Sequence, residues 1–284
     1  MIIITGATGR LGSQIVRQLL QRVPADRVGV SVRDPGRAAG LAESGVRVRR
    51  GDYTDPGSLA AAFEGATQVL IVSADATGAA ALAQHATAID AAREAGARRV
   101  LYTSHQAAGP DSLFEPMPDH AATERHLAGS GTPFTSLRNG FYAATVPHLL
   151  GQALQTGELR APADGPVSWT AHADLAEAAA IILAGEGRFD GATPPLTAPD
   201  ALDLKDVAGL LTELSGRTVH RVVVDDDEWA AGLIGHGVPE GRANMLLGMF
   251  RAARNGEFAT TGATLESLLG RAATPLRSIL QEAV

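Results

Sequence analysis

The sequence reads Ile2-Ile3-Ile4-Thr5-Gly6-Ala7-Thr8-Gly9-Arg10-Leu11-Gly12-Ser13 near its start, where a β-branched run leads directly into a glycine-rich turn. The apolar residues between Leu11 and Leu20 then recur at helical spacing. A strand, a tight glycine turn and a helix together offer free backbone N–H groups at a helix N-terminus, which suit a pyrophosphate. The glycines are spaced GxxGxxG rather than GxGxxG, so the match to the common dinucleotide fingerprint is imperfect. The segment predicts nucleotide binding, and the alternative is a tight turn that binds nothing.

Length, charge and cysteine content narrow the possible classes of protein. The 284 residues suffice for one large α/β domain or for a domain with an appended lobe. The formal charge of −7 and the pI near 5.6 argue against a nucleic-acid-binding surface. The absence of cysteine excludes disulfides, a thiolate nucleophile and cysteine-ligated zinc. The apolar runs are too short to span a membrane, and the first predicted strand leaves no room for a signal peptide. We therefore expect a cytoplasmic protein that binds neither membranes nor nucleic acids, and the sequence does not indicate its oligomeric state.

The first half of the chain alternates predicted strands and helices. Strands are expected at residues 2–5, 28–33, 46–50, 68–73 and 99–104. A helix is expected at about Thr77 to Ala95, with Leu82, Ala86 and Ile89 on one face and His85 in solvent. This alternation predicts right-handed βαβ units and a Rossmann-type, doubly wound parallel sheet of the α/β class. Ligands of such sheets bind beyond the carboxyl ends of the strands, so the residues that end each strand are the informative ones.

The pattern changes after the fifth predicted strand. Residues 105–119 are polar and proline-containing, which predicts an ordered loop over the cleft, followed by a helix near 120–128 and a strand at 133–138. Farther on, residues 221–224 suggest a small strand, and residues 246–254 and 265–269 look helical. We therefore expect an NAD(P)-binding Rossmann domain at residues 1–138 and a smaller, mostly helical substrate lobe at 139–284. Segments near residues 173–198 are expected to return to the sheet.

The end of the second strand should lie beside the adenosine ribose and so select the cofactor. Arg33 stands there, and a guanidinium makes charge-assisted hydrogen bonds to a 2′-phosphate. Arg10, inside the glycine turn, is a second cation placed to reach the same phosphate. Asp34 opposes this interpretation, unless it points away from the ribose or caps the next helix ahead of Pro35. The residues favour NADPH over NADH, and the alternative is that both arginines are solvated surface residues.

Two further strand ends suggest cofactor contacts. Asp52 closes the third strand, where it could accept a hydrogen bond from the adenine amino group or simply cap a turn. Ser73 and Ala74 end the fourth strand and would flank the pyrophosphate and the ribose. Both predictions follow from the parallel arrangement of the sheet.

Several common chemistries are excluded by inspection. Many reductases of this fold use a tyrosine as proton donor and a lysine four residues later. Here the three tyrosines are followed at that spacing by glycine, glutamine and valine, and the single lysine is Lys205. At the expected place in the helix after the cleft loop, His120 and Glu124 occupy the two positions. No HExxH motif or GxSxG elbow occurs, so the remaining possibility is a cofactor that performs the difficult step.

The chain resembles the NmrA-like group of atypical short-chain dehydrogenases/reductases, and within it the type-2 NAD(P)H:quinone oxidoreductases. The matching segments span nearly the whole chain in the expected order. They are Gly6 to Gly12, Val32-Arg33-Asp34-Pro35, Gly51-Asp52-Tyr53-Thr54-Asp55, Tyr102-Thr103-Ser104, His120 to Glu124, Leu137-Arg138-Asn139-Gly140-Phe141-Tyr142 and Thr274-Pro275-Leu276. The family often has asparagine at the position of Asp34, which is a small departure.

The resemblance implies a two-lobed reductase that binds NADPH without flavin or metal. Such an enzyme delivers hydride directly to a small acceptor such as a quinone or a similar conjugated carbonyl, azo or aryl compound. The implied cofactor-binding residues are Gly6, Thr8, Gly9, Arg10, Leu11, Gly12, Arg33, Asp52, Ser73, Ala74, Thr103, Asn139 and Gly140.

The acceptor pocket is implied to lie after the sixth strand. Phe141 and Tyr142 would shape it, and Met117 and Trp169 could complete it; the alternative is that Met117 and Trp169 are ordinary core residues. His105 ends the fifth strand and is the candidate proton donor, because an imidazole can serve near neutral pH. The alternative is that His105 simply hydrogen-bonds the cofactor or the backbone.

A second function from another class remains open. NmrA-like relatives are thought to include redox sensors that bind the dinucleotide without turning it over. A sensor needs a surface for a partner rather than an acceptor pocket. The sequence shows no extension or tail for a partner, which favours the enzyme.

Overall fold

A seven-stranded parallel sheet forms the centre of the structure, a computed structural model that describes residues 1–282 and 284. The strands follow the order β3-β2-β1-β4-β5-β6-β8, and every neighbouring pair is parallel. Their bounds are β1 (Ile2–Thr5), β2 (Val28–Val32), β3 (Arg47–Arg50), β4 (Gln68–Ile71), β5 (Arg99–His105), β6 (Phe134–Asn139) and β8 (Gly191–Ala192). The predicted doubly wound, Rossmann-type sheet is confirmed.

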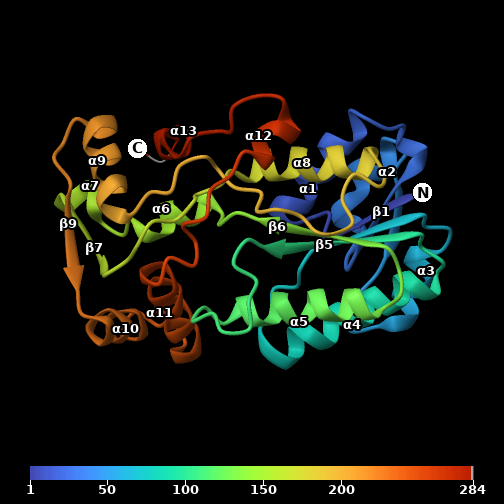
Figure 1. Cartoon of the computed structure of the whole chain (residues 1–284), viewed down its shortest axis with the longest axis horizontal. Helices are drawn as coiled ribbons and strands as arrows, with labels where there is room; N and C mark the ends of the chain where they lie inside the picture. Colours follow the sequence, from blue (N-terminus) through green and yellow to red (C-terminus); the bar gives the residue numbers. More distant parts are fainter. Residues whose placement is uncertain (283) are drawn as a thin grey trace.

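Helices cover both faces of this sheet (Figure 1). One layer holds α1 (Arg10–Leu20), α8 (His172–Ala184) and α12 (Thr264–Leu269), and the other holds α3 (Pro56–Phe63), α4 (Gly78–Glu94) and α5 (Pro116–Gly129). The triple isoleucine of β1 shows why: Ile2 and Ile4 belong to the core under α1 and α8, whereas Ile3 belongs to the opposite core. Successive strand residues alternate between faces, so a strand buried on both sides must be apolar throughout.

A second group of elements lies beside the sheet, at the left of Figure 1. Its two-stranded parallel sheet pairs β7 (Glu158–Pro162) with β9 (His220–Val224). Its longer helices are α9 (Leu204–Ser215), α10 (Asp226–Gly235), α11 (Glu240–Arg254) and α13 (Leu276–Gln281). The shorter elements of the chain are η1 (Ala25–Arg27), η2 (Pro35–Ala38), α2 (Ala39–Glu43), η3 (Ala143–Thr145), α6 (Val146–Leu149) and α7 (Ala153–Thr156). The group of elements around β7 and β9 has its own apolar core, which contains Phe250 and Phe258.

Between β7 and α9, the chain returns to the main sheet. Helix α8 packs along α1, and β8 pairs with β6. Leu196 forms an isolated bridge with Asn139 at the end of β6. The division of the chain at residue 138 stays a prediction.

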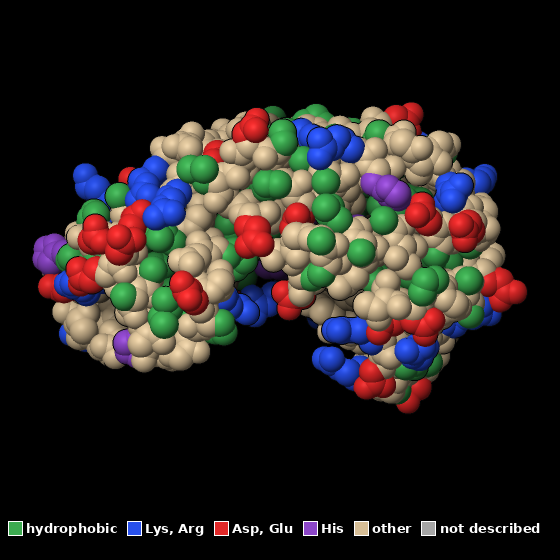
Figure 2. Space-filling view, turned by 90° about the horizontal axis from the view of Figure 1, so that it is seen from below, with side chains coloured by type: hydrophobic (Ala, Val, Ile, Leu, Met, Phe, Trp, Pro, Cys, Tyr) green, Lys and Arg blue, Asp and Glu red, His purple; other side chains and the backbone are tan. Residues whose placement is uncertain are grey.

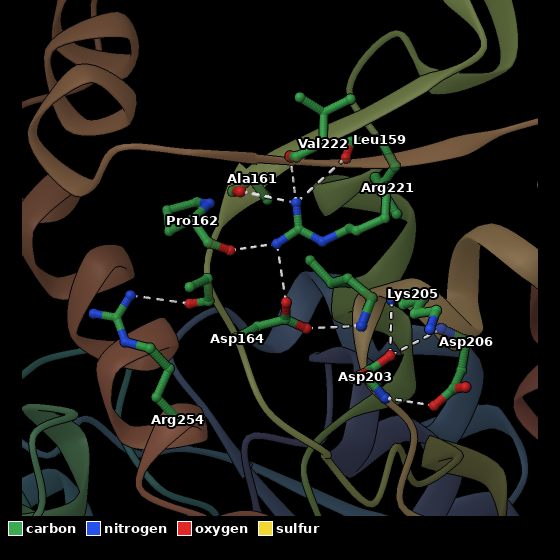
Figure 3. Close-up of polar contacts among 12 residues, drawn as sticks. Leu159, Ala161, Pro162, Asp164, Asp203, Lys205, Asp206, Arg221, Val222 and Arg254 are labelled. Atoms are coloured by element: carbon green, nitrogen blue, oxygen red, sulfur yellow. Dashed lines mark hydrogen bonds and ion pairs between the residues drawn. The ribbon is translucent and has the colours of Figure 1, made fainter.

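Arg221 fastens the small sheet from within (Figure 3). Its guanidinium donates to the carbonyls of Ala161, at 2.8 Å, and Pro162, and to Asp164 Oδ1 at 2.9 Å. Asp164 Oδ2 also accepts the N–H of Leu204, at the start of α9, at 2.7 Å. Because both side chains are largely buried, at 9% and 13% exposure, this ion pair depends on its additional hydrogen bonds.

Several boundaries differ from the predicted ones. Helix α5 begins at Pro116 rather than near residue 120, because proline suits the first helical position, where its missing N–H costs nothing. Strand β6 extends to Asn139, and α11 begins at Glu240 instead of residue 246.

His85 is buried, at 3% exposure, and the prediction that it lies in solvent is wrong. Of the three residues predicted to share the inner face of this helix, Ile89 is buried, but Leu82 and Ala86 are only partly so. Alanines dominate α4 and give it no strong apolar face. Its packing between α3 and α5 therefore decides which side is inside.

The turn after β1 requires glycine at position 12. A Cβ on Gly12 would lie 2.3 Å from the Gly6 carbonyl oxygen, so Gly12→Ala should lower the free energy of unfolding by about 1–3 kcal/mol. Gly40→Ala is the matched control, because a Cβ on this helical glycine meets nothing within 4 Å and should stabilise by about 0.5–1 kcal/mol. Urea unfolding measures both, and equal midpoints for the two variants would contradict the steric argument.

The Arg221–Asp164 pair should contribute more than an exposed pair in the same sheet. Arg221→Met leaves Asp164 buried without its cation and should lower the free energy of unfolding by about 3 kcal/mol. Arg160→Met removes the exposed pair with Glu158, whose side chains are 53% and 48% exposed, and should cost less than about 1 kcal/mol. Thermal and urea unfolding measure the difference. An Arg221→Met variant with the stability of the wild type would refute the stabilising role of the Arg221–Asp164 pair.

Candidate functional site

The glycine turn places a helix N-terminus at the carboxyl edge of the sheet. Gly6 has a φ of +61°, which glycine adopts without strain, and Gly9 is the N-cap of α1 without a side-chain cap. The N–H groups of Arg10, Leu11 and Gly12 open the helix and therefore have no intrahelical acceptor. Gly6, Gly9 and Arg10 are exposed, Thr8 is half-buried, and Leu11 and Gly12 are buried. This arrangement offers uncompensated N–H groups to an anion.

Two arginines flank this turn. Arg10 and Arg33 are exposed, and neither has an ion pair or a side-chain hydrogen bond to another residue in the described part of the chain. Asp34 does not compete for Arg33, since its Oδ1 accepts the N–H of Gly36 at 3.0 Å and caps η2. The second of the two alternatives for Asp34 is therefore the observed one. Both guanidiniums remain available to a phosphate.

Asp52 serves as a turn cap in the structure. Its Oδ1 accepts the N–H of Thr54 at 2.9 Å and the Thr54 hydroxyl at 2.8 Å. These hydrogen bonds lower the pKa of Asp52, and the nearby Arg33 lowers it further. The contact of Asp52 with an adenine stays a prediction.

A cavity of about 560 Å³ opens at the end of β4. Figure 2 shows the molecule hollowed on this side, between its two parts. Its lining includes Ser73 and Ala74 after β4, His120 of α5, and Arg242 of α11. Within the described chain, Ser73 and Ala74 are the sequence-predicted site residues among those that line it. The cavity therefore adjoins the predicted cofactor edge and reaches residues that the sequence did not single out as site residues.

Thr103, Asn139 and Gly140 lie at the ends of the two neighbouring strands. Thr103 Oγ1 accepts the N–H of Ser73 at 2.8 Å and so fixes the chain where β4 ends. Asn139 Oδ1 is buried without a hydrogen-bond partner among the described residues. A buried acceptor of this kind suits a donor on a ligand. Gly140 has no room for a side chain, because a Cβ would lie 2.2 Å from Thr170 Oγ1.

His105 ends β5 beside Asn139 and is buried. Its Nδ1 accepts the N–H of Ala107 at 3.1 Å, and its ring lies edge-on to Phe141, with 5.3 Å between the centroids. Burial lowers the pKa of His105 to about 3, so the imidazole is neutral at pH 7. The sequence left open that His105 hydrogen-bonds the backbone, and the structure shows this bond. The role of His105 as proton donor stays a prediction.

The four predicted pocket residues divide into two places. Met117, Phe141 and Trp169 share one apolar cluster, and the rings of Phe141 and Trp169 lie 5.3 Å apart. Trp169 Nε1 donates to the carbonyl of Leu202 at 3.0 Å. Tyr142 instead packs against the core under α1, with its ring 4.2 Å from that of His172. The structure therefore brings three of these residues together and separates Tyr142 from them.

A polar network of buried His85 and half-buried His120 reaches the cavity wall. The N–H of Ala74 donates to His85 Nε2 at 2.9 Å, and His85 Nδ1 lies 2.9 Å from Thr123 Oγ1. The Tyr102 hydroxyl lies 2.8 Å from His120 Nδ1. Burial lowers the pKa values of His85 and His120 to about 4 and raises that of Tyr102, so all three are neutral at pH 7. Sequence reasoning missed this network, although the His120–Glu124 spacing was a signal for it.

Glu124 holds in place helix α5, which also carries His120. Its Oε1 accepts the hydroxyls of Ser104 and Ser136, both at 2.8 Å, and its Oε2 accepts Arg138 Nη2 at 2.6 Å. Burial raises the pKa of Glu124, but the hydrogen bonds from Arg138 and the two serines outweigh it and leave a carboxylate. The residue that replaces the lysine of the dyad pattern thus ties α5 to β5 and β6.

Two kinds of feature are absent from residues 1–282 and 284. No cluster of three or more His, Asp or Glu side chains is arranged to hold a metal ion. No helix is both long enough and apolar enough to cross a membrane.

Comparison with known proteins gives relatives along the whole chain. The chain is 36% identical to quinone oxidoreductase 2 of Escherichia coli (strain K12), with 97% of this chain and 96% of the relative covered. A solved structure of the E. coli NADPH-dependent quinone oxidoreductase in complex with NADPH matches with a TM-score of 0.93 and 34% identity, covering 99% of each chain. The structure of Citrobacter sp. triphenylmethane reductase complexed with NADP(H) matches with a TM-score of 0.92 and 33% identity, covering 100% of each chain.

A third relative, the NAD(P)H azoreductase of Xenophilus azovorans, is 28% identical over 96% of this chain and 94% of its own length. These relatives are named as reductases or oxidoreductases, and the prediction of an NAD(P)H-dependent oxidoreductase is confirmed at the level of this class. The model of the NmrA-like family matches residues 1–280. The chain belongs to the NmrA-like family.

Proposed function

We propose that the protein is an NADPH-dependent oxidoreductase that delivers hydride directly to a quinone or a similar conjugated small molecule. The observation that carries this proposal is a helix N-terminus with two uncommitted arginines beside a cavity of about 560 Å³. The relatives described above include quinone and azo-dye reductases, which supports a small conjugated acceptor.

The residues at the carboxyl edge suit NADPH. The free N–H groups of Arg10 to Gly12 would hold the pyrophosphate, and the guanidiniums of Arg10 and Arg33 would hold the 2′-phosphate. Asn139 Oδ1 offers an unused acceptor to an amide group at the other end of the cofactor. We propose that residues 1–138 form this dinucleotide-binding domain and residues 139–284 the substrate lobe.

Reduction of a quinone by hydride requires little acid catalysis from the protein. Bound NADPH supplies the hydride, and one acceptor, one NADPH and one proton give the reduced acceptor and NADP⁺. A quinone spreads the resulting negative charge over its conjugated ring, so no Tyr–Lys pair is needed. The chain binds and orients the two reactants, the proton comes from solvent, and neither flavin nor metal takes part.

Turnover of NADPH with a quinone tests the proposed activity. Mixing the protein with NADPH and a panel of quinones should lower the absorbance of the reduced nicotinamide well above the rate without protein. Tight NADPH binding without oxidation across quinones, azo dyes and triphenylmethane dyes would reject the enzyme and support the dinucleotide sensor.

Arg33 should determine the preference for NADPH. Arg33→Ala removes charge-assisted hydrogen bonds to the 2′-phosphate and should raise the Kd for NADPH about 10- to 100-fold, because such bonds contribute about 1.5–3 kcal/mol. The Kd for NADH should change less than about twofold. Arg17→Ala, an exposed arginine farther along α1, is the control and should affect neither. Calorimetric titration measures all three, and equal losses for both cofactors would rule out the phosphate contact.

A further inference from the structure

The directions of the hydrogen bonds around His85 can be assigned from the backbone. The N–H of Ala74 can only donate, so His85 Nε2 must accept it, at 2.9 Å. A neutral imidazole then carries its proton on Nδ1, which donates to Thr123 Oγ1 at 2.9 Å. The Thr123 hydroxyl in turn donates to the carbonyl of Asp119, also at 2.9 Å. The end of β4 thus fixes the tautomer of His85.

This tautomer decides where the proton of Tyr102 goes. The Tyr102 hydroxyl lies 3.4 Å from His85 Nδ1 and 2.8 Å from His120 Nδ1. Because His85 Nδ1 carries a proton, it cannot accept one from the phenol. Tyr102 is fully buried, so a phenol that only accepted from His120 would leave its own O–H unpaired. We therefore assign the phenol as the donor to His120 Nδ1, which puts the proton of neutral His120 on Nε2.

The Nε2–H group of His120 is the last donor in this chain of hydrogen bonds. His120 lines the cavity, and its Nε2 has no hydrogen-bond partner among the described residues. Glu124, one turn later on α5, fixes the helix to β5 and β6 through Ser104, Ser136 and Arg138. The donor is therefore rigidly placed on the wall of the space that would receive an acceptor.

We propose that His120 donates a hydrogen bond from Nε2 to the oxygen of the acceptor, and that Tyr102 and His85 are positioning residues that fix its tautomer. The proposal rests on the function proposed above, and the role it gives to His120 differs from the one predicted for His105, which is to donate a proton. His105, unlike His120, is not among the residues that line the cavity.

The proposed step balances without a charged acid. When hydride adds to a quinone, two electrons enter the ring and one quinone oxygen gains negative charge. The Nε2–H group stabilises this oxygen through a hydrogen bond, and a proton from water completes the hydroquinone. His120 keeps its own proton, as a neutral imidazole does when it acts as an electrophile. The lowered pKa of His120, about 4, agrees with a ring that stays neutral at pH 7.

Nitrogen chemical shifts test the tautomer without any turnover. In the full-length protein labelled with ¹⁵N-histidine, long-range ¹H–¹⁵N spectra should show His120 as a single Nε2–H tautomer that does not titrate between pH 5.5 and 8. His120→Gln assigns the signal. Tyr102→Phe should mix the two tautomers, whereas Tyr53→Phe, whose hydroxyl bonds Thr5 and Val72 instead, should leave the signal unchanged. A protonated Nδ1 in the wild type would overturn the proposal.

Kinetics of two His120 variants test the contact with the acceptor. His120→Leu should lower kcat/KM for a quinone about 10- to 1000-fold, the effect of removing one donor to an oxyanion, with the Kd for NADPH within about twofold. His120→Gln keeps an N–H donor and should recover most of this loss. Wild-type rates in His120→Leu would reject the proposal.

The same spectra separate a failure of this inference from a failure of the proposed function. If the wild type shows no turnover, the proposed function fails, and titration with the quinone alone decides the inference. A shift of the His120 Nε2–H signal on addition of the quinone supports the contact. An unchanged signal at saturating quinone, with the fold intact, refutes it.

Discussion

The close approach of α1 to the end of β1 is the contact on which the site depends. Gly12 packs against the carbonyl of Gly6 so closely that a single Cβ would force the two apart. This packing points the free N–H groups of α1 at the carboxyl edge of the sheet, next to Arg10 and Arg33. Parallel pairing of β1 with β2 and β4 brings the other strand ends to the same edge. Without that turn, the arginines would be ordinary surface charges.

The two ends of the site differ in electrostatic character. The proposed cofactor end has exposed, permanently charged guanidiniums and helix N–H groups, which are able to attract an anion even in contact with water. His85 and His120 line the cavity, Tyr102 lies within hydrogen-bond distance of both, and desolvation keeps all three groups neutral. A neutral donor in a buried place stabilises charge that develops during reaction and costs no prior desolvation of an ion. In the proposed function, fixed charges would therefore serve cofactor binding and a neutral hydrogen-bond donor would serve the reaction.

The sheet could be predicted because its signals are local. Strands β1, β2 and β4 are short, mostly apolar runs, and β3 alternates arginine with valine at its start. Each is followed by a helical segment, so the spacing of apolar residues and the glycine- and proline-containing turns were enough to predict the sheet. The elements after β6 carried weaker signals, and β7, α9 and α10 were not predicted. Their positions are decided by contacts far apart in the chain, such as Arg221 with Asp164 and the carbonyls of β7. The buried face of α4 was predicted wrongly for a related reason. The helix is rich in alanine, so the helices packed against it decide which side is buried.

The sequence alone determined the glycine turn, the arginines beside it and the absence of a Tyr–Lys pair, because each is a matter of residue type and spacing. It could not determine that His85, Tyr102 and His120 meet, since these residues lie on α4, β5 and α5 and only packing joins them. The tautomer of His120 is more remote still. It follows from a backbone N–H at the end of β4, and hydrogen-bond direction is a property of the assembled network rather than of any residue.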